Sequence, residues 1–103
     1  MTKISITKND NLVQVIKVCG HSGYANSGSD IVCSSVSTAM YVSYGLLQKA
    51  KCDFTFKENA NIPEMELMIN KPDTITNLVM ANLVDVLEGI AFDYKAYVCI
   101  INE

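Results

Sequence analysis

Hydrophobic residues along this chain recur with two different periods, and the order of these periods is the strongest constraint on its fold. Five segments alternate or are rich in valine and isoleucine, as β-strands are, and two repeat apolar residues at three- and four-residue steps, as helices do. The predicted strands cover 3–7, 12–19, 52–57, 65–69 and 94–101, and the predicted helices cover 31–50 and 74–90. The predicted order is therefore ββαββαβ.

A chain of 103 residues, of which 50% are hydrophobic, can close one core and has little left for a second. Residues 1–103 contain no internal repeat or low-complexity linker, so we expect a single domain. The pattern predicts an α+β fold, a two-layer sandwich in which two helices pack on a mixed five-stranded sheet. The strand 12–19 is apolar on both faces, which predicts a central strand covered on both sides.

Charge and hydropathy exclude several classes of partner. The net charge is -3 and no block of lysine or arginine occurs, so the electrostatic signature of a nucleic-acid-binding protein is missing. Residues 1–8 alternate between polar and apolar, unlike an export signal, and no later apolar run approaches the length that spans a membrane. We expect a soluble cytoplasmic protein whose partners are proteins or peptides, without nucleic acid or membrane.

Four cysteines are present, too few for the disulfide scaffold of a small secreted domain. They are Cys19, Cys33, Cys52 and Cys99. We expect free thiols. Three of them fall within predicted strand patterns, where cysteine usually acts as a small buried hydrophobic residue. Only Cys33 has neighbours that suggest chemistry.

The segment 20–33 combines the only histidine, His21, with Cys33 at the start of a helical pattern. Asp30, or Ser29, is the natural N-cap of that helix. The segment also contains the glycines Gly20, Gly23 and Gly28. Glycine permits backbone angles that other residues avoid, so we expect a flexible loop that folds back, admits a substrate backbone and orders when substrate binds.

These residue types suit nucleophilic catalysis. A thiol ionises more readily in the first turn of a helix, where unpaired amides and aligned peptide dipoles favour negative charge. His21 can take the proton of Cys33 if the loop brings the two side chains together. The amides of Cys33 and Ser34 are the expected donors to the oxygen that becomes negative when a carbonyl is attacked.

Two further residues have alternative roles. Asp30 either caps the helix or orients the imidazole of His21, and the cap is the favoured interpretation because Gly-Ser-Asp is a common helix start. Ser37 lies one helical turn after Cys33, where its hydroxyl can touch the sulfur or a substrate. Its alternative role is that of a small residue chosen for packing.

Other interpretations compete with catalysis. Cys33 falls on an apolar stripe continued by Val36 and Met40, so it is equally consistent with a core residue in a non-catalytic protein-binding module. Cys19, His21 and Cys33 are a third candidate set, as metal ligands, but a fourth ligand and a Cys-x-x-Cys pair are missing. We therefore predict neither a metal nor an organic cofactor.

At this point a family resemblance becomes visible. The stretch 20–25, followed by Gly28, 30–33 and 36–37, closely resembles the motif of the ribosomal-processing cysteine protease family called Prp. The segment 87–91 and Tyr94 are similar to the C-terminal part of that family. The resemblance thus covers nearly the whole chain.

The resemblance implies a bacterial protease that removes the N-terminal extension of large-subunit ribosomal protein twenty-seven. Transferred to this sequence, the family roles fall on Cys33 as nucleophile and His21 as base, with Asp30 and Ser37 in support. The family further implies a homodimer, a flexible loop between the catalytic residues, and cleavage near a short apolar motif of the substrate.

This chain departs from the commoner family pattern at three positions where alanine is frequent. They are Ser22, Ser34 and Ser35. Each change replaces one small residue with another and leaves the expected catalytic positions intact. The additional hydroxyl of Ser34, next to the nucleophile, is expected to affect hydrogen bonding or substrate preference.

Overall fold

The computed structural model describes residues 1–26, 30–59 and 61–103, and it confirms the predicted order of elements. The strands are β1 (Thr2–Asn9), β2 (Leu12–Cys19), β3 (Phe54–Asn59), β4 (Glu64–Ile69) and β5 (Val98–Asn102). The helices are α1 (Ile31–Lys49) and α2 (Thr74–Asp93). The α+β class, with two helices and one five-stranded sheet, is thus confirmed.

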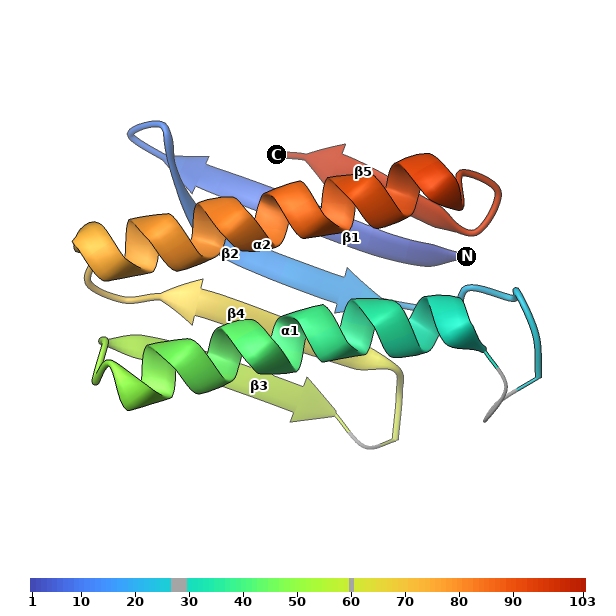
Figure 1. Ribbon diagram of the computed structural model, residues 1–103, viewed down its shortest axis with the longest axis horizontal. Helices are drawn as coiled ribbons and strands as arrows, with labels where there is room; N and C mark the ends of the chain where they lie inside the picture. Colours follow the sequence, from blue (N-terminus) through green and yellow to red (C-terminus); the bar gives the residue numbers. More distant parts are fainter. Residues whose placement is uncertain (27–29, 60) are drawn as a thin grey trace.

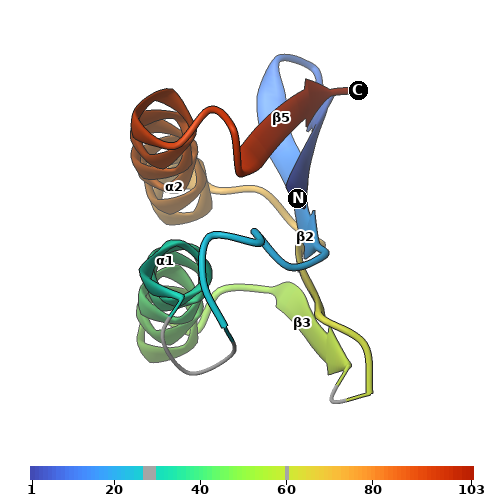
Figure 2. The same ribbon diagram turned by 90° about the vertical axis from the view of Figure 1, so that its right-hand side faces the viewer.

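The sheet is mixed, with the strand order β3-β4-β2-β1-β5. β1 and β5 run parallel, and every other neighbouring pair is antiparallel. α2 connects β4 to β5 on the far side of β1 and lies across the sheet beside α1 (Figure 1). Both helices cover the same face, so the molecule has two layers (Figure 2).

The core lies between the helices and the sheet. On β1 the alternation of the sequence directs Ile4 and Ile6 toward the helices, while Lys3 remains exposed. The helices contribute buried residues at three- and four-residue steps, namely Val32, Val36, Met40 and Leu47 from α1 and Val79, Met80, Leu83 and Leu87 from α2. This packing fixes the position of α1 relative to the strands and therefore the position of the first turn of α1.

β2 is the central strand of the sheet, as predicted, but the prediction that both of its faces are covered is wrong. The helices lie on one face only, against which Ile16 and Val18 are buried (Figure 2). Val15 points to the other face and is half-buried between its cross-strand neighbours Thr7 and Met68. Neighbouring strands shield part of an apolar side chain without a second layer, which a one-dimensional pattern cannot distinguish from full coverage.

Several element boundaries differ from the prediction. α2 continues through Gly89 to Asp93, because a glycine inside a helix lowers its stability without ending it. The last strand begins at Val98 instead of residue 94, after a turn in which the amide of Tyr97 donates to the carbonyl oxygen of Tyr94 at 2.9 Å. Cys52 precedes β3 instead of lying within it, and all four cysteines are half-buried free thiols.

α2 also qualifies the expectation that no segment approaches a membrane-spanning length. It has 20 residues, and an 18-residue window within it has a mean hydropathy of 1.5, which satisfies the length and composition of such a helix. However, Asp85 and Glu88 are exposed within it, and its buried face packs against the sheet and α1. A core helix of a globular domain passes the same test, so length and hydropathy alone are weak evidence here.

Candidate active site

The first turn of α1 is organised by Asp30, which is the N-cap of the helix. Its Oδ1 accepts hydrogen bonds from the backbone amides of Val32 and Cys33, both at 3.0 Å. Its carbonyl oxygen accepts the amide of Ser34 at 3.1 Å. Of the two roles considered for Asp30, the geometry shows the cap.

The second carboxylate oxygen of Asp30 reaches back to the loop. The hydroxyl of Ser22 donates to Asp30 Oδ2, and the amide of Tyr24 donates to Ser22 Oγ at 3.1 Å. The Ser22 hydroxyl, followed by the amides of Cys33 and Val32, lowers the pKa of Asp30 to about 2 against the opposing effect of burial. Asp30 is therefore an anion that ties the loop carrying the histidine to the helix carrying the cysteine.

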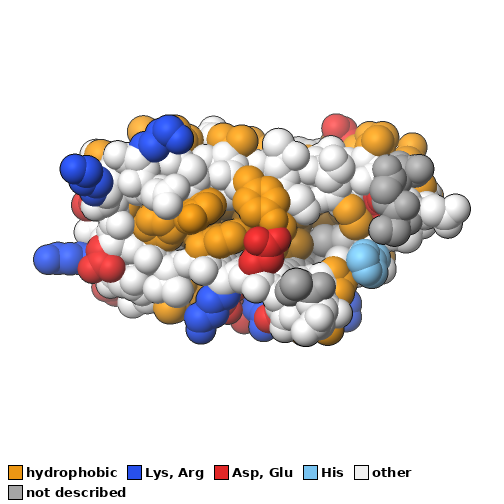
Figure 3. Space-filling view, turned by 90° about the horizontal axis from the view of Figure 1, so that it is seen from below, with side chains coloured by type: hydrophobic (Ala, Val, Ile, Leu, Met, Phe, Trp, Pro, Cys, Tyr) orange, Lys and Arg blue, Asp and Glu red, His pale blue; other side chains and the backbone are white. Residues whose placement is uncertain are grey.

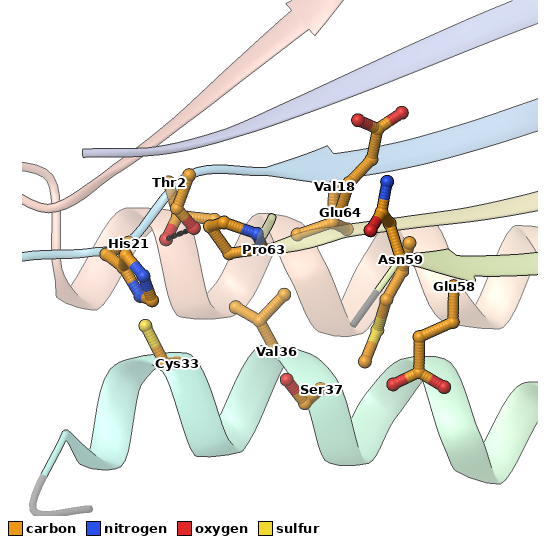
Figure 4. Close-up of a pocket in the computed structure, with 12 residues that line it drawn as sticks. Thr2, Val18, His21, Cys33, Val36, Ser37, Glu58, Asn59, Pro63 and Glu64 are labelled. Atoms are coloured by element: carbon orange, nitrogen blue, oxygen red, sulfur yellow. Dashed lines mark hydrogen bonds between the residues drawn. The ribbon is translucent and has the colours of Figure 1, made fainter. Parts of the chain in front are cut away.

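The candidate nucleophile and base face each other across this junction. His21 follows the end of β2, and its ring points toward the sulfur of Cys33 on α1 (Figure 4). The hydrogen-bond donor to Cys33 Sγ is the backbone amide of Ser22, at 3.3 Å. Cys33 is half-buried and His21 is exposed, so the interpretation of Cys33 as a sealed core residue is wrong.

Glycine is required at position 20 for a structural reason other than loop flexibility. Its φ is +88°, and a Cβ atom there would lie 2.6 Å from the carbonyl oxygen of Met1. Its amide also donates to the carbonyl oxygen of Pro63 at 2.9 Å. Only glycine permits this close approach, which fixes the backbone immediately before His21.

The other two glycines of the loop, Gly23 and Gly28, do not test the predicted flexibility. Gly23 also has a positive φ, of +75°, but a Cβ atom there would meet nothing within 4 Å. Gly28, together with Ser27 and Ser29, lies outside the described residues. The flexible loop that orders on substrate therefore stays a prediction.

The expected oxyanion donors are engaged elsewhere. The amide of Cys33 donates to the Asp30 side chain, and the amide of Ser34 donates to the Asp30 backbone. The expectation that these two amides are free to receive a developing negative charge is wrong for this geometry. An aspartate cap satisfies the amides that would otherwise be unpaired at a helix start.

Two hollows meet at the candidate pair. One has a volume of about 200 Å³ and extends from His21 and Cys33 past Ser37 to Glu58 and Pro63 at the ends of β3 and β4 (Figure 4). The other, of about 630 Å³, lies beside the loop that carries His21. It is lined by Gly23, Ala25, Asn26, Asp30 and Ser34 in addition to the three residues that belong to both hollows, His21, Cys33 and Ser37. The half-buried Cys33 thus lies where the two hollows meet.

The supporting serines occupy different places. Ser37 is half-buried and lines both hollows one turn after Cys33. Ser34 is exposed and lines the larger hollow only. Both serines therefore line a hollow that Cys33 also lines, and their roles remain predictions.

The metal-site interpretation has no geometric support. Within the described ranges, no group of three or more histidine, cysteine, aspartate or glutamate side chains is arranged to hold a metal ion. Cys19, His21 and Cys33, the three ligands considered, therefore do not form a cluster.

The sequence analysis missed three residues of the site. Ser22 is only 3% exposed and joins the loop to Asp30. The sequence feature that could have identified it is a serine where the family pattern commonly has alanine. Glu58 and Pro63 line the smaller hollow from the β3–β4 hairpin. They are distant in sequence from Cys33, and no pattern within one chain predicts that the end of this hairpin meets α1.

The comparisons with known proteins agree with this geometry. The family model described as cysteine protease Prp matches residues 1–99. The chain is 28% identical over 103 residues to "Ribosomal processing cysteine protease Prp" of Mycoplasma genitalium, which covers 100% of this chain and 96% of the relative.

Solved structures show the same fold. The ribosomal processing protease Prp from S. aureus with a covalently linked product peptide superimposes with a TM-score of 0.93 at 19% identity, covering 100% of both chains. SMU.848 from Streptococcus mutans superimposes with a TM-score of 0.79 at 19% identity, covering 100% of this chain and 96% of the other. Because the family match spans nearly all of the sequence, the chain belongs to the cysteine protease Prp family and is a cysteine protease.

Proposed function

We propose that this protein is an endopeptidase that removes the N-terminal extension of large-subunit ribosomal protein twenty-seven, with Cys33 as nucleophile and His21 as base. Membership of the Prp family supports the reaction class. The name of the Mycoplasma genitalium relative supports a ribosomal substrate. A second S. aureus Prp structure, with a substrate peptide, supports peptide binding by this fold, with a TM-score of 0.88 at 17% identity.

The observation that carries the proposal is the position of the sulfur. Cys33 lies in the first turn of α1, its sulfur accepts the Ser22 amide at 3.3 Å, and the ring of His21 points toward it (Figure 4). A helix start and an amide donor both stabilise a thiolate, and a neighbouring imidazole can accept its proton. The two hollows that meet at Cys33 provide room for the chain before and after a scissile bond.

The chemistry follows from these positions. The proton of the Cys33 thiol passes to His21, and the sulfur forms a bond to the peptide carbonyl carbon. The bond from carbon to nitrogen then breaks as His21 gives its proton to the departing amine, which leaves a thioester on Cys33. Water, deprotonated by His21, attacks the thioester, restores the thiol and releases the acid. Asp30 holds the loop and helix together during these steps and remains an anion.

The test uses purified protein and ribosomal protein twenty-seven carrying its N-terminal extension, with cleavage followed by mass spectrometry. The wild type removes the extension, whereas Cys33→Ala and His21→Ala do not. Cys99→Ala is the matched control, because Cys99 lies in β5 and lines neither hollow. Undiminished cleavage by Cys33→Ala would end the assignment.

The family resemblance also leads us to propose a homodimer. Large apolar side chains on the outer surfaces of the helices support it, since Leu78 is 70% exposed, Val42 58% and Leu46 50%. Light scattering of the purified protein measures its mass directly. A mass of 11.3 kDa that does not change as the concentration rises would contradict a dimer.

We further propose that the reaction takes place in the cytoplasm. The support is chemical, because the four cysteines are free thiols, the state that the reducing cytoplasm maintains. Cell fractionation with an antibody checks this, and recovery of the protein outside the cytoplasmic fraction would contradict it.

A further inference from the structure

The smaller hollow continues away from the nucleophile along one face of α1. Cys33, Ser37 and Tyr41 follow one another at four-residue steps, so they lie on the same side of the helix. Glu58, on the edge strand β3, faces this row, and the hydroxyl of Tyr41 donates to Glu58 Oε1. Figure 4 shows Cys33 and Glu58 at opposite ends of the hollow, with Val36 and Ser37 between them.

Aromatic side chains from α1 and β3 form a wall beyond Glu58, outside the lining of the hollow. The ring of Tyr41 lies 6.0 Å from that of Phe56, and Tyr44 stacks on Phe56 at 4.6 Å between ring centres. Phe54 continues this wall at 5.8 Å from Tyr44. The space-filling view from this side shows a band of hydrophobic side chains that leads toward the histidine (Figure 3).

Glu58 forms no ion pair with any other residue that the structure describes. Among those residues, the one ion pair joins Lys17 to Glu64, at 3.0 Å. Glu58 is exposed, and within the described ranges its hydrogen-bond donor is the hydroxyl of Tyr41. The donation raises the pKa of the Tyr41 hydroxyl, so this phenol stays neutral.

We infer that Glu58 and the neighbouring rings of Tyr41 and Phe56 form a binding site for a lysine or arginine side chain of the protein substrate. The inference rests on the proposed peptidase function. A carboxylate supplies a charge-assisted hydrogen bond, and adjacent aromatic rings attract the same cation through their π faces. A neutral or acidic side chain gains neither interaction at this position.

The helix sets the spacing between this site and the scissile bond. Cys33 and Tyr41 are eight positions apart, which at 1.5 Å per residue corresponds to about 12 Å along α1. An extended peptide covers that distance in about three to four residues. The cation is therefore expected roughly three to four residues from the bond that Cys33 attacks, on one side of it.

The experiment uses a series of substrate peptides in which one lysine is moved through the five positions on each side of the cleavage site. Norleucine, which keeps the four-carbon chain of lysine but lacks its ammonium group, replaces lysine in the matched series. In the wild type, lysine at the favoured position raises kcat/KM about tenfold over norleucine, as expected for one charge-assisted hydrogen bond. Glu58→Gln removes this preference and Glu58→Lys reverses it, as read from the lysine-to-norleucine ratio of kcat/KM within each variant.

Glu88→Gln is the matched control, since Glu88 is equally exposed but lies on α2 outside the hollow. It retains the preference of the wild type. A lysine-to-norleucine ratio that is the same in wild type and Glu58→Gln at every position would overturn the inference.

A binding measurement separates this inference from the peptidase function. The affinity of Cys33→Ala for the fluorescently labelled lysine and norleucine peptides is compared with that of the double variant carrying Glu58→Gln. If Glu58→Gln lowers the affinity for the lysine peptide about tenfold more than the affinity for the norleucine peptide, the cation site is supported. This conclusion holds even if neither peptide is cleaved, because a lack of cleavage would contradict only the proposed reaction. Equal affinities for both peptides in Cys33→Ala would contradict the cation site even if cleavage occurs.

Discussion

The two helices of this protein begin with the same residue type and use it differently. Asp73 caps α2, and its carboxylate accepts the amide of Thr76 at 2.8 Å while Thr76 Oγ1 accepts the amide of Asp73 at 2.7 Å. This reciprocal capping box is complete within four residues of chain. Thr76 is fully buried, so the start of α2 has a structural role only.

At α1 the equivalent position holds Cys33, three residues after the cap Asp30. Its amide donates to the cap as the amide of Thr76 does, but the described start of α1 has no reciprocal capping box like that of α2. The sulfur instead accepts an amide from Ser22, eleven residues earlier, and lines two hollows. The difference shows how one capping geometry becomes a candidate active site when its third residue is bonded to a distant loop.

Exchanging the side chains at these equivalent positions gives the largest expected effect. Cys33→Thr gives α1 a threonine at the position where α2 has Thr76. It lowers kcat/KM for the extended ribosomal substrate by about 10³-fold or more, because the covalent nucleophile is lost. The reverse change, Thr76→Cys, leaves the folded enzyme active. Circular dichroism confirms that each variant is folded, and retained activity in Cys33→Thr would break the comparison.

Removing the hydroxyl of Thr76 tests the structural side of the comparison. Thr76→Ala removes a buried hydroxyl that accepts the amide of Asp73, and it lowers the free energy of unfolding by about 1 kcal/mol. Urea denaturation measures the change, and the specific activity of the folded fraction stays at the wild-type level. A loss of activity without a loss of stability would show that α2 contributes to catalysis.

Removing the hydroxyl of Ser22 has a smaller, local effect. Ser22→Ala deletes the bond to Asp30 but keeps the Ser22 amide that donates to Cys33 Sγ. We expect a few-fold decrease in kcat/KM and a pKa of Asp30 that moves up from about 2 toward its ordinary value of 3.8. Carbon NMR of the carboxyl group measures the pKa, and an unchanged value would mean that the Ser22 hydroxyl is not its main cause.

The smallest effect is the acid dependence of stability. The folded pKa of Asp30, about 2, lies below the ordinary value of 3.8, so its stabilising contribution is complete above the ordinary value and is lost as pH falls through about 2. Asp30→Asn therefore shows a shallower decline of melting temperature between pH 4 and pH 2 than the wild type does. Parallel acid profiles for the two proteins would contradict this assignment.

Local patterns were sufficient for part of this structure. The period-2 and helical repeats predicted every strand and helix, because alternation and three- to four-residue steps are set by backbone geometry before tertiary contacts form. The same local logic identified Asp30 as a cap, since a capping side chain binds amides two and three residues ahead. It misplaced the end of α2, which continues to Asp93, beyond the predicted end at residue 90.

The candidate site was only partly predictable. His21 and Cys33 stand out in sequence because few residue types supply a base near neutrality and a nucleophile. The contribution of Ser22 could not be derived, because it depends on how the loop folds back onto Asp30. The oxyanion prediction failed for a local reason, since it assumed free amides that the predicted cap Asp30 in fact occupies.

The sequence by itself determined the order of the elements and the capped start of α1, and it singled out the candidate pair His21 and Cys33, all of which depend on residues close along the chain. Only the tertiary structure decided that both helices lie on one face of the sheet and that Glu58 shares a hollow with Cys33 (Figures 2 and 4). The physical reason is that burial is decided by which surfaces meet in space. A periodic pattern shows that a surface must be covered, but the packed chain determines what covers it.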